Sequence, residues 1–456
     1  MGRDFNEFKQ EVKGKSVGVV GLGVSNIPLI EFLLSLGAEV VGYDKRELDS
    51  LGEEVHGFKD RVELNLGEDY LDHLIGLHMI FKTPGMRFDH PALVNAKKDG
   101  AIITSEMEEF LKYCRAKTIG ITGSDGKTTT TTVVGEILKK AGYKVYVGGN
   151  IGTPLFTEVE NIRPQDMVVL ELSSFQLMTM TTSPEIAIVT NLSPNHLDVH
   201  KDMEEYIEAK RNIFRFQKAS DLLILNEDNE ITRSFAALAK GKVEFFSSKN
   251  ENEDAYYKDG SLYLRDERIV DLNEMKVKGI HNAENFLAAF LAVEDFVVKP
   301  VMRETALTFP GVKHRCQFIR EFQGVKYYND SIASSPTRTL ASLRSFDRKV
   351  NVILGGYDKQ LDFAPLAEEG YKYIKNAVLV GATKYKIQEA FRKVEEKSGR
   401  YVPLHMAESF EDAVKIMKSL SKEGDAAILS PACASFDLFR NFEERGDRFV
   451  KLVNEF

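Results

Sequence analysis

A run of glycine, serine, aspartate, lysine and threonine at positions 122–130, TGSDGKTTT, offers the clearest chemistry in this chain. It lies between an apolar run typical of a strand and a helical pattern. In such a loop successive backbone N–H groups can point at phosphate oxygens, the lysine adds positive charge, and a threonine hydroxyl can bind Mg²⁺. Strict phosphate-loop spacing would place glycine where the chain has Ile121, so only the second half of that pattern is present. We predict an ATP site formed by Gly123, Ser124, Asp125, Gly126, Lys127, Thr128 and Thr129.

Two polar side chains follow apolar strand patterns in the same part of the chain. Glu171 comes directly after MVVL, and His196 follows the strand pattern EIAIVTNL. Either residue alone is more often an ordinary polar residue at a strand end. Because the carboxyl ends of parallel strands share one edge of a sheet, both side chains can lie beside the phosphate loop. Together they predict a metal site.

An earlier glycine turn, GLGVSN at positions 21–26, resembles the start of a dinucleotide-binding fingerprint. Asp44 lies at the end of the next strand pattern, where an acid can bind a ribose. Asn26 stands where the third glycine belongs, so the pattern is weak evidence for NAD. Lys45 and Arg46 suit a nucleotide with a different base. The alternative is a tight turn with no ligand.

Cationic and polar residues recur late in the chain. They are His314-Arg315, Asn329-Asp330-Ser331, Lys359 at the end of LGGYDK, and SPACASFDLFRNFEERG from Ser430. Arginine and lysine can fix carboxylates or phosphates there, arginine by bidentate geometry. Each could instead be a solvated charge, and the last segment could be core packing under a helix.

The elements that position these residues indicate an α/β protein. Strand, glycine turn, helix and strand follow one another from Ser16, which opens a doubly wound sheet. The phosphate loop opens a second such unit, and strand and helix patterns begin again after Pro310. A length of 456 residues also favours three domains. We predict three Rossmann-like or doubly wound sheets, the central one in a P-loop-type ATPase domain, with domains at 1–105, 106–310 and 311–456.

Composition excludes several classes of protein. No apolar run approaches the roughly 18 residues that a membrane span needs, and the first residues lack the apolar core of a signal peptide, so we expect a cytoplasmic protein without membrane contact. A net charge of −9 argues against nucleic-acid binding. Three distant cysteines, Cys114, Cys316 and Cys433, indicate buried thiols, not disulfides or zinc. We expect small-molecule partners and a monomer.

Taken in order, the motifs resemble those of the Mur ligases. The resemblance covers nearly the whole chain, through VVGLGVSN, TGSDGKTTT, GGNIGTP, LELSSFQL, TNLSPNHLDVH, HNAEN, NDSIAS and SPACASFDLFRNFEERG. Within the family it is greatest to the enzymes that add D-glutamate to UDP-N-acetylmuramoyl-L-alanine. That activity would use ATP and Mg²⁺, pass through an acyl phosphate, release ADP and phosphate, and serve peptidoglycan precursor synthesis.

The resemblance also implies a role for individual residues. UDP would bind at Ser25, Asn26, Asp44, Lys45, Arg46, Thr83 and Gly85. The muramoyl-alanine arm would pass Asn150, Gln176 and His196. ATP would lie on the phosphate loop, near Asn282 and Asn285, with Arg315 and Asp330 reaching it from the last domain. D-glutamate would be bound by Ser334, Lys359, Ser435 and Phe442.

Lys210, in YIEAKRNIF, matches the lysine that the family carries as a carbamate. A carbamate presents a carboxylate suited to Mg²⁺, whereas an ammonium would be repelled by bound metal ions. The resemblance therefore implies catalytic roles for Lys127, Glu171, His196 and Lys210. It implies two ions, held by Thr128, Glu171, His196 and carbamylated Lys210. From spacing alone, Lys210 would be a surface lysine on an amphipathic helix.

One departure from the family pattern concerns the amino-acid pocket. The family commonly has Asp-Ser-Lys-Ala-Thr where this chain has Asp330-Ser331-Ile332-Ala333-Ser334, so Ile332 cannot supply that positive charge. Three alternatives stay open at this point. They are a Mur ligase that adds a different amino acid, an NAD-dependent oxidoreductase built on the front glycine turn, and an ATP-binding module without catalysis.

Overall fold

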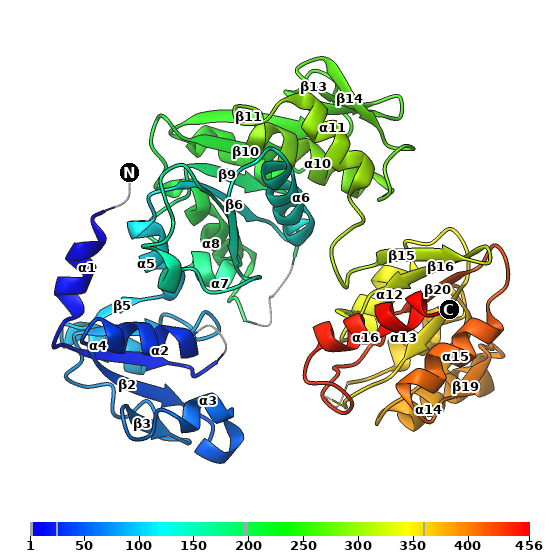
Figure 1. Cartoon of the computed structure of the whole chain (residues 1–456), viewed down its shortest axis with the longest axis horizontal. Coiled ribbons are helices and arrows are strands. Elements are labelled where there is room, and N and C mark those ends of the chain that lie inside the picture. Colours follow the sequence, from blue (N-terminus) through cyan, green and yellow to red (C-terminus); the bar gives the residue numbers. More distant parts are fainter. Residues whose placement is uncertain (1–2, 24–25, 195–198, 359–360) are drawn as a thin grey trace. The chain divides into compact units, whose positions relative to one another are not determined.

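The computed structural model describes residues 3–23, 26–194, 199–358 and 361–456. Within these ranges the chain forms three mostly parallel sheets of five, nine and six strands, each flanked by helices (Figure 1). The chain divides into two compact units, Met1–Phe309 and Pro310–Phe456, and the first unit holds two of the sheets. The predicted α/β class with three Rossmann-like or doubly wound sheets is confirmed.

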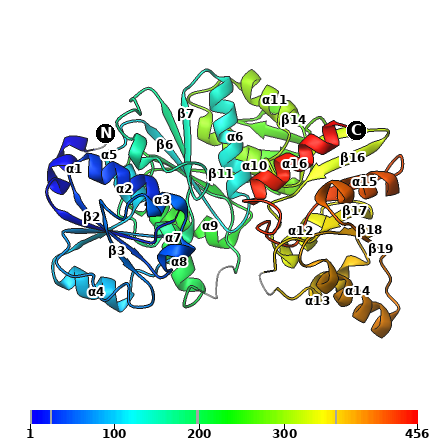
Figure 2. The same ribbon diagram turned by 60° about the horizontal axis from the view of Figure 1, so that its bottom comes forward.

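The front sheet has five parallel strands in the order β3-β2-β1-β4-β5. The strand order reverses between β1 and β4, and the first glycine turn follows β1 at this point, where doubly wound sheets bind ligands. Helices α2 and α4 lie on opposite sides of the sheet (Figure 2). The strands are β1 Ser16–Val20, β2 Glu39–Asp44, β3 Glu63–Leu66, β4 Met79–Lys82 and β5 Ile102–Thr104. The helices are α1 Phe5–Val12, α2 Asn26–Ser35, α3 Glu53–His56, α4 Pro91–Lys98 and α5 Glu106–Tyr113, with a 3₁₀ turn at Leu48–Ser50.

The central sheet places the phosphate loop at the end of an interior strand, because β6 pairs with β8 on one side and β9 on the other. Its order is β14-β13-β12-β11-β10-β9-β6-β8-β7. The strands are β6 Lys117–Thr122, β7 Val145–Gly149, β8 Met167–Glu171, β9 Ile186–Val189, β10 Leu222–Asn226, β11 Lys242–Ser247, β12 Ala255–Lys258, β13 Ser261–Leu264 and β14 Glu267–Asp271.

The helices of the central sheet position the loop between them. Helices α6 and α10 pack side by side, and α7 packs against α8 (Figures 1 and 2). Their bounds are α6 Lys127–Lys140, α7 Ser174–Leu177, α8 Met203–Arg215, α9 Glu230–Ser234, α10 Ile280–Val293 and α11 Lys299–Thr308, with 3₁₀ turns at Phe156–Glu158 and Phe235–Leu238.

The second unit is a six-stranded sheet in the order β15-β16-β20-β17-β18-β19, with β15 antiparallel to β16. Alternate residues of β17 enter two cores: Val352 packs beneath α12, α13 and α14, and Ile353 beneath α15 and α16. The strands are β15 Gln317–Phe322, β16 Val325–Asn329, β17 Val350–Leu354, β18 Ile374–Leu379, β19 Leu404–Met406 and β20 Ala426–Leu429. The helices are α12 Pro336–Leu343, α13 Ala364–Gly370, α14 Lys384–Ser398, α15 Phe410–Leu420 and α16 Phe442–Asn454.

Two expectations drawn from composition concern membrane spans and the state of the cysteines. No helix among the described residues is long and apolar enough to cross a membrane. Cys114 and Cys433 are buried free thiols, as predicted, whereas Cys316 is only half-buried. That part of the prediction is wrong because Cys316 lies in a loop just before β15, where it packs against the edge of one core without being enclosed by it.

Candidate active site

The phosphate loop turns from β6 into α6 at a glycine that no other residue can replace without strain. Gly126 is the N-cap of α6 and has φ of 80°, in the left-handed region. A Cβ there would lie 2.4 Å from Oδ1 of Asn285, which also accepts a hydrogen bond from Thr130 Oγ1 at 3.2 Å. Asn285, which lies on α10, therefore packs directly against the loop. The first amides of α6 are left available for a phosphate at the helix N-terminus.

The remainder of the loop is fixed by hydrogen bonds to the segment after β9. The amide of Ser124 donates to the carbonyl of Asn191 at 2.8 Å, and the amide of Asp125 donates to Asn191 Oδ1 at 3.0 Å. Ser124 Oγ donates to the carbonyl of Ser193 and lies 3.0 Å from the hydroxyl of Tyr206 on α8. The loop is thus held in place from outside, which is the preorganisation that phosphate binding needs.

Lys127 lies over the phosphate loop. Its Nζ donates to the carbonyls of Gly123 at 2.8 Å and Ser124 at 2.9 Å. Thr128 and Thr129 follow it in the first turn of α6 and are half-buried. The ammonium and these hydroxyls therefore lie at the same helix N-terminus, where the positive charge would neutralise a phosphate and a hydroxyl could bind its Mg²⁺.

Glu171 ends β8, the strand next to β6, and is 2% exposed. Its Oε1 accepts a hydrogen bond from Asn150 Nδ2 at 2.8 Å, while Oε2 is buried and has no hydrogen-bond partner among the described residues. A buried carboxylate oxygen without a donor is costly unless a cation or water satisfies it. Glu171 therefore fits a metal ligand, and Asn150 orients it.

Lys210 is buried in the middle of α8, with 2% of its surface exposed. Its Nζ donates to Thr122 Oγ1 at 2.9 Å and to the carbonyl of Gly123 at 3.1 Å. Burial holds the pKa of Lys210 well below its usual value, and nearby Lys127 lowers the pKa further. A surface lysine, the interpretation from spacing alone, is therefore wrong, because α8 presents this residue to the phosphate loop.

The front glycine turn is stabilised by its own polar residues. Asn26 Nδ2 donates to the carbonyls of Val20 and Gly21, so an amide fills the place where the fingerprint has glycine. Asp44 is buried and accepts hydrogen bonds from the amide of Leu22 and from Arg46. Burial by itself raises the pKa of Asp44, but the bonds from Arg46 and Leu22 outweigh it and lower the pKa overall.

The remaining front residues lie at the same edge of the sheet. The amide of Thr83 donates a hydrogen bond to the carbonyl of Val20, and a Cβ on Gly21 would lie 2.9 Å from Thr83 Cβ. The turns after β1 and β4 are therefore in contact. Gly85 and Lys45 are exposed. The turns after β1, β2 and β4, which were predicted to form one nucleotide site, thus lie together at the carboxyl edge of the sheet.

Asp330 and Ser435 are buried within the second unit. The Asp330 oxygens accept hydrogen bonds from the amide of Cys316 and from Ser430 Oγ, and burial raises the pKa of this carboxyl. Phe442 begins α16, its carbonyl accepts from Ser331 Oγ, and its ring meets the edge of His314. Arg315 and Ser334 are half-buried. These residues surround the carboxyl ends of β16 and β20.

The comparisons with known proteins bear on this arrangement. Family models match three successive parts of the chain: the Mur ligase MurD-like N-terminal domain at 15–105, the Mur ligase middle domain at 121–293, and the Mur ligase glutamate ligase domain at 314–433. Curated proteins named UDP-N-acetylmuramoylalanine--D-glutamate ligase match along the full length. The protein of Clostridium beijerinckii is 59% identical over 99% of both chains, and that of Clostridium perfringens is 58% identical over 100% of both. The chain belongs to the Mur ligase family.

Solved Mur ligases share its fold at low identity. The UDP-N-acetylmuramate-alanine ligase MurC of Thermotoga maritima aligns with TM-score 0.59 and 19% identity over 97% of this chain and 99% of that one. MurF of Acinetobacter baumannii aligns with TM-score 0.60 and 15% identity over 98% and 92%. These alignments support the three-domain α/β architecture.

Within this Mur ligase, three predicted site residues lie outside the described residues: Ser25, His196 and Lys359. Of the four predicted metal ligands, the described part of the chain therefore contains Thr128, Glu171 and Lys210. Gln176 is buried, and its Oε1 accepts from the amide and hydroxyl of Ser173 in a capping box that starts α7. Asn282 donates to the carbonyl of Lys278 at the start of α10.

Arg445 was not predicted from the sequence. It is 2% exposed on α16 and donates to Ser331 and to the carbonyls of Cys433 and Ala434. It thereby joins the NDSIAS and SPACAS segments that carry Ser334 and Ser435. Its place in FEERG, amid other charges, gave no signal, because a buried arginine and a solvated one look the same in sequence.

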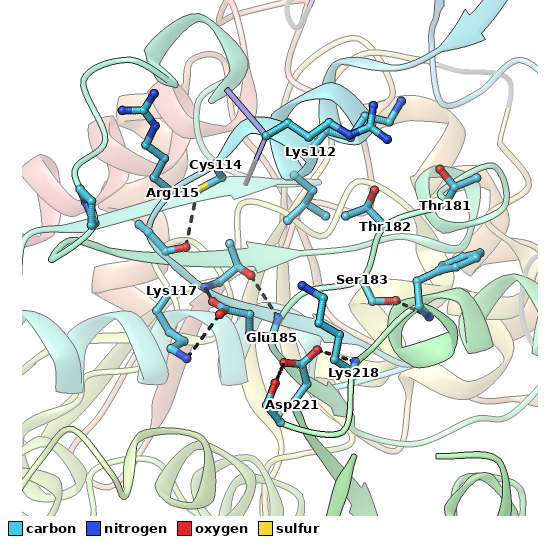
Figure 3. A pocket seen from close by; sticks show the side chains of 17 residues that line it. Lys112, Cys114, Arg115, Lys117, Thr181, Thr182, Ser183, Glu185, Lys218 and Asp221 are labelled. Carbon is cyan, nitrogen blue, oxygen red and sulfur yellow. Dashed lines mark hydrogen bonds and ion pairs between the residues drawn. The ribbon is translucent and has the colours of Figure 1, made fainter. Parts of the chain in front are cut away.

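A cavity of about 510 Å³ opens elsewhere, at the amino ends of the central strands (Figure 3). It holds none of the predicted site residues. Lys117 there contacts Glu185, and Lys112 contacts Glu108 and Glu109. Since these two lysines already contact carboxylates, we assign the cavity no ligand.

Proposed function

We propose that this Mur ligase joins D-glutamate to UDP-N-acetylmuramoyl-L-alanine, with ATP cleaved to ADP and phosphate, as a step of peptidoglycan precursor synthesis. The observation that carries the proposal is the 58–59% identity, over essentially full length, to relatives whose names state this reaction. The alternative is a Mur ligase that adds a different amino acid. The solved relatives of that kind match at 15–19% identity, which reports the fold alone.

The front sheet is proposed to bind the UDP group through Ser25, Asn26, Asp44, Lys45, Arg46, Thr83 and Gly85. The support is the convergence of the turns after β1, β2 and β4 at the strand-order reversal. The carboxylate of Asp44 already accepts from Leu22 and Arg46, which leaves it poorly placed to take both hydroxyls of an NAD ribose. Calorimetric titration with UDP and with NAD decides between them, and NAD binding without UDP binding would overturn the assignment.

The phosphate loop is proposed to bind ATP through residues 123–129, with Asn282 and Asn285 nearby and with Arg315 and Asp330 contributing from the second unit. We place the domain boundaries at 105/106 and 310/311. The second agrees to within a residue with the division of the chain into compact units after Phe309. The enzyme is proposed to act in the cytoplasm, where ATP and nucleotide-linked precursors are supplied, and as a monomer.

Mg²⁺ is proposed to be held by Thr128, Glu171, His196 and Lys210, and bound Mg²⁺ supplies neutralisation of phosphoryl charge. Two ions need more carboxylate oxygens than Glu171 alone provides. The described residues contain no group of three His, Cys, Asp or Glu side chains that could hold a metal. A carbamate on Lys210 would add one. The neutral amine that carbon dioxide requires is favoured by the lowered pKa of Lys210.

Carbamylation is testable without measuring activity. Enzyme equilibrated with ¹³C-bicarbonate is expected to give a carbamate ¹³C resonance that is absent from Lys210→Ala. The Lys139→Ala variant serves as control, because Lys139 is an exposed lysine. An identical resonance in Lys210→Ala, or none in the unaltered enzyme, would overturn the carbamate.

D-glutamate is proposed to bind in the second unit through Ser334, Lys359, Ser435 and Phe442. Arg445 positions two of the segments that carry them. Ile332 removes the family lysine from this pocket, so Lys359 is assigned as its cation. Lys359→Ala is expected to raise the KM for D-glutamate far more than the KM for ATP, because truncating one member of a desolvated charge pair costs about 2–5 kcal/mol.

The chain's residues carry the reaction by positioning and charge. Lys127 and the loop amides stabilise the γ-phosphoryl group as it passes to the substrate carboxylate, and no nucleophilic side chain is required. The amine of D-glutamate then attacks the acyl carbon, and phosphate leaves. Asn150 and Gln176 are assigned to the muramoyl-alanine arm beside Glu171. Exclusion of water protects the acyl phosphate from hydrolysis.

The decisive experiment is a phosphate-release assay in which each substrate is omitted in turn. Release is expected only when UDP-N-acetylmuramoyl-L-alanine, D-glutamate and ATP are all present. L-alanine, a diamino acid or D-alanyl-D-alanine replacing D-glutamate is expected to give no release. Release with one of these and none with D-glutamate would establish the alternative ligase.

A further inference from the structure

The loop after the Thr83–Gly85 turn contacts the helix that carries Lys210. Arg87 lies in this loop of the front domain, and its two terminal nitrogens donate to both carboxylate oxygens of Glu205, at 2.8 and 3.1 Å. Glu205 is in the first turn of α8, in the central domain. Arg87 also donates to the carbonyl of Val199 at 2.9 Å. One side chain therefore connects the front and central domains of the first unit at three points.

The guanidinium of Arg87 is held by carboxylates on two edges. Asp89 holds the other edge of the guanidinium, with bonds of 2.8 and 2.9 Å, and Lys201 lies 3.3 Å from Asp89. The side chains of Arg87 and Glu205 are 26% and 19% exposed, so solvent screens this pair less than a fully exposed one. The bidentate geometry fixes orientation as well as distance. In keeping with it, Arg87 lowers the pKa of Glu205 to about 2.

From Glu205 the contacts continue to the phosphate loop. Glu205 Oε2 lies 3.4 Å from His200 Nδ1, and His200 Nε2 lies 2.9 Å from Ser174 Oγ, three residues beyond Glu171. The neighbouring residue on α8, Tyr206, meets the His200 ring edge-on and reaches Ser124 Oγ of the loop at 3.0 Å. The start of α8 is thus packed between the front domain and the ATP-binding loop.

We propose that Arg87 is a positioning residue that aligns the nucleotide-linked substrate with the ATP site by fixing the start of α8 against the front domain. The inference rests on the proposed function, in which the uridine end is held by the front domain while the carboxylate reacts beside the phosphate loop. The two ends of one substrate are then bound by different domains. A misplacement of about 1 Å between reacting groups can cost about 10²-fold in rate.

The test compares four variants of the full chain with the unaltered enzyme: Arg87→Ala, Glu205→Gln, the double variant, and Arg61→Ala. Arg61 is the matched control, because it forms a bidentate pair with Glu31 at 2.7 and 2.9 Å that is exposed and lies wholly within the front domain. Calorimetry measures UDP and ADP affinity, steady-state kinetics measures kcat, and hydrogen exchange reports on residues 203–206.

Arg87→Ala is expected to lower kcat by about 10- to 100-fold while UDP and ADP affinities stay unchanged, because it alters none of the residues proposed to bind either nucleotide. The double variant is expected to lose no more than either single variant, since both remove the same contact. Faster exchange at 203–206 should accompany the loss in every variant but Arg61→Ala.

Three results would overturn the inference: an unchanged kcat in Arg87→Ala, fully additive losses in the double variant, or loss of UDP affinity, which would place Arg87 inside the nucleotide pocket. Failure of the unaltered enzyme to bind UDP would instead overturn the UDP assignment of the front domain. The exchange measurement still tests the Arg87–Glu205 contact in that case, because it needs no substrate.

Discussion

Two lysines donate to the same backbone carbonyl, that of Gly123, and their environments divide their roles. Lys127 Nζ lies 2.8 Å from this oxygen at the partly exposed start of α6, whereas Lys210 Nζ lies 3.1 Å from it inside the protein. Two full positive charges this close would repel, and burial disfavours the charge on Lys210. Burial and the neighbouring lysine therefore favour the neutral amine at Lys210, the form that carbon dioxide requires.

Replacing Lys127 with alanine is expected to lower turnover by about 10²-fold or more, because a preorganised charge aimed at the transferring phosphoryl group is lost. The measurement is kcat at saturating substrates, together with thermal unfolding to show that the fold persists. Lys139→Ala, on the last turn of the same helix and away from the loop, is the control and should keep full activity. Near-normal turnover in Lys127→Ala would refute the ATP-site assignment.

At the scale of the element, two glycines at opposite ends of α6 allow the effect of backbone strain to be distinguished from that of a steric clash. Gly126 has φ of 80° and would place a Cβ 2.4 Å from Asn285 Oδ1, whereas Gly142 has φ of 94° and open space around it. Gly142→Ala is expected to cost about 1 kcal/mol of stability and leave ATP affinity unchanged. Gly126→Ala should in addition weaken ATP binding at least about tenfold, because the loop must move away from α10. Equal ATP affinity in both variants would contradict this reading of the loop.

The turn after β4 depends on a buried lysine. Lys82 is 3% exposed, and its Nζ donates to the carbonyls of Thr83 and Met86, which brace the turn. Burial lowers its pKa to about 8 from the usual 10.5. The unfolded chain therefore binds the proton more tightly than the folded chain does. The free-energy cost of burying the charged lysine has its full value below pH 8 and disappears as the pH rises to 10.5.

Comparison of Lys82→Met with the unaltered enzyme tests this directly. The difference in unfolding free energy between them is expected to change by about 3 kcal/mol from pH 8 to pH 10.5, with the unaltered enzyme gaining relative to the variant. Urea unfolding across that range measures it, and Lys98→Met, at an exposed position on α4, is the control. A difference that does not vary with pH would show that Lys82 titrates normally.

Most of the parallel strands and the glycine turns could be predicted because apolar runs and glycines report local backbone directly. The antiparallel hairpin of β12 and β13 was not predicted, although Asp259-Gly260 between AYYK and SLYL is a known hairpin signal. The Arg445–Ser331 and Arg87–Glu205 contacts could not be found in this way, since each joins residues more than 100 positions apart. Burial of a charge is a property of the tertiary fold, not of spacing.

For the whole molecule, the two compact units imply that the chain can be divided. Residues 310–456 have their own sheet with apolar clusters on both faces, and the last strand, β20, lies inside that sheet between β16 and β17. A unit that buries both faces of its sheet, at a length typical of a domain, should fold alone. Arg445 supports this, because all its hydrogen-bond acceptors belong to the same unit.

The fragment 310–456 is therefore expected to unfold cooperatively in urea and to show no ATP affinity, while the fragment 1–309 binds ADP without ligating D-glutamate. A matched fragment that ends at Asn441 lacks α16 and should fail to fold, because Phe449 and Val453 fill one of the two cores and Arg445 joins the loops beside them. Circular dichroism and denaturant titration of the three fragments measure this. Both apolar clusters of this sheet consist of residues from the second unit. A fragment 310–456 that stays unfolded would therefore mean that these clusters do not suffice for folding, and the division after Phe309 would not be a folding boundary.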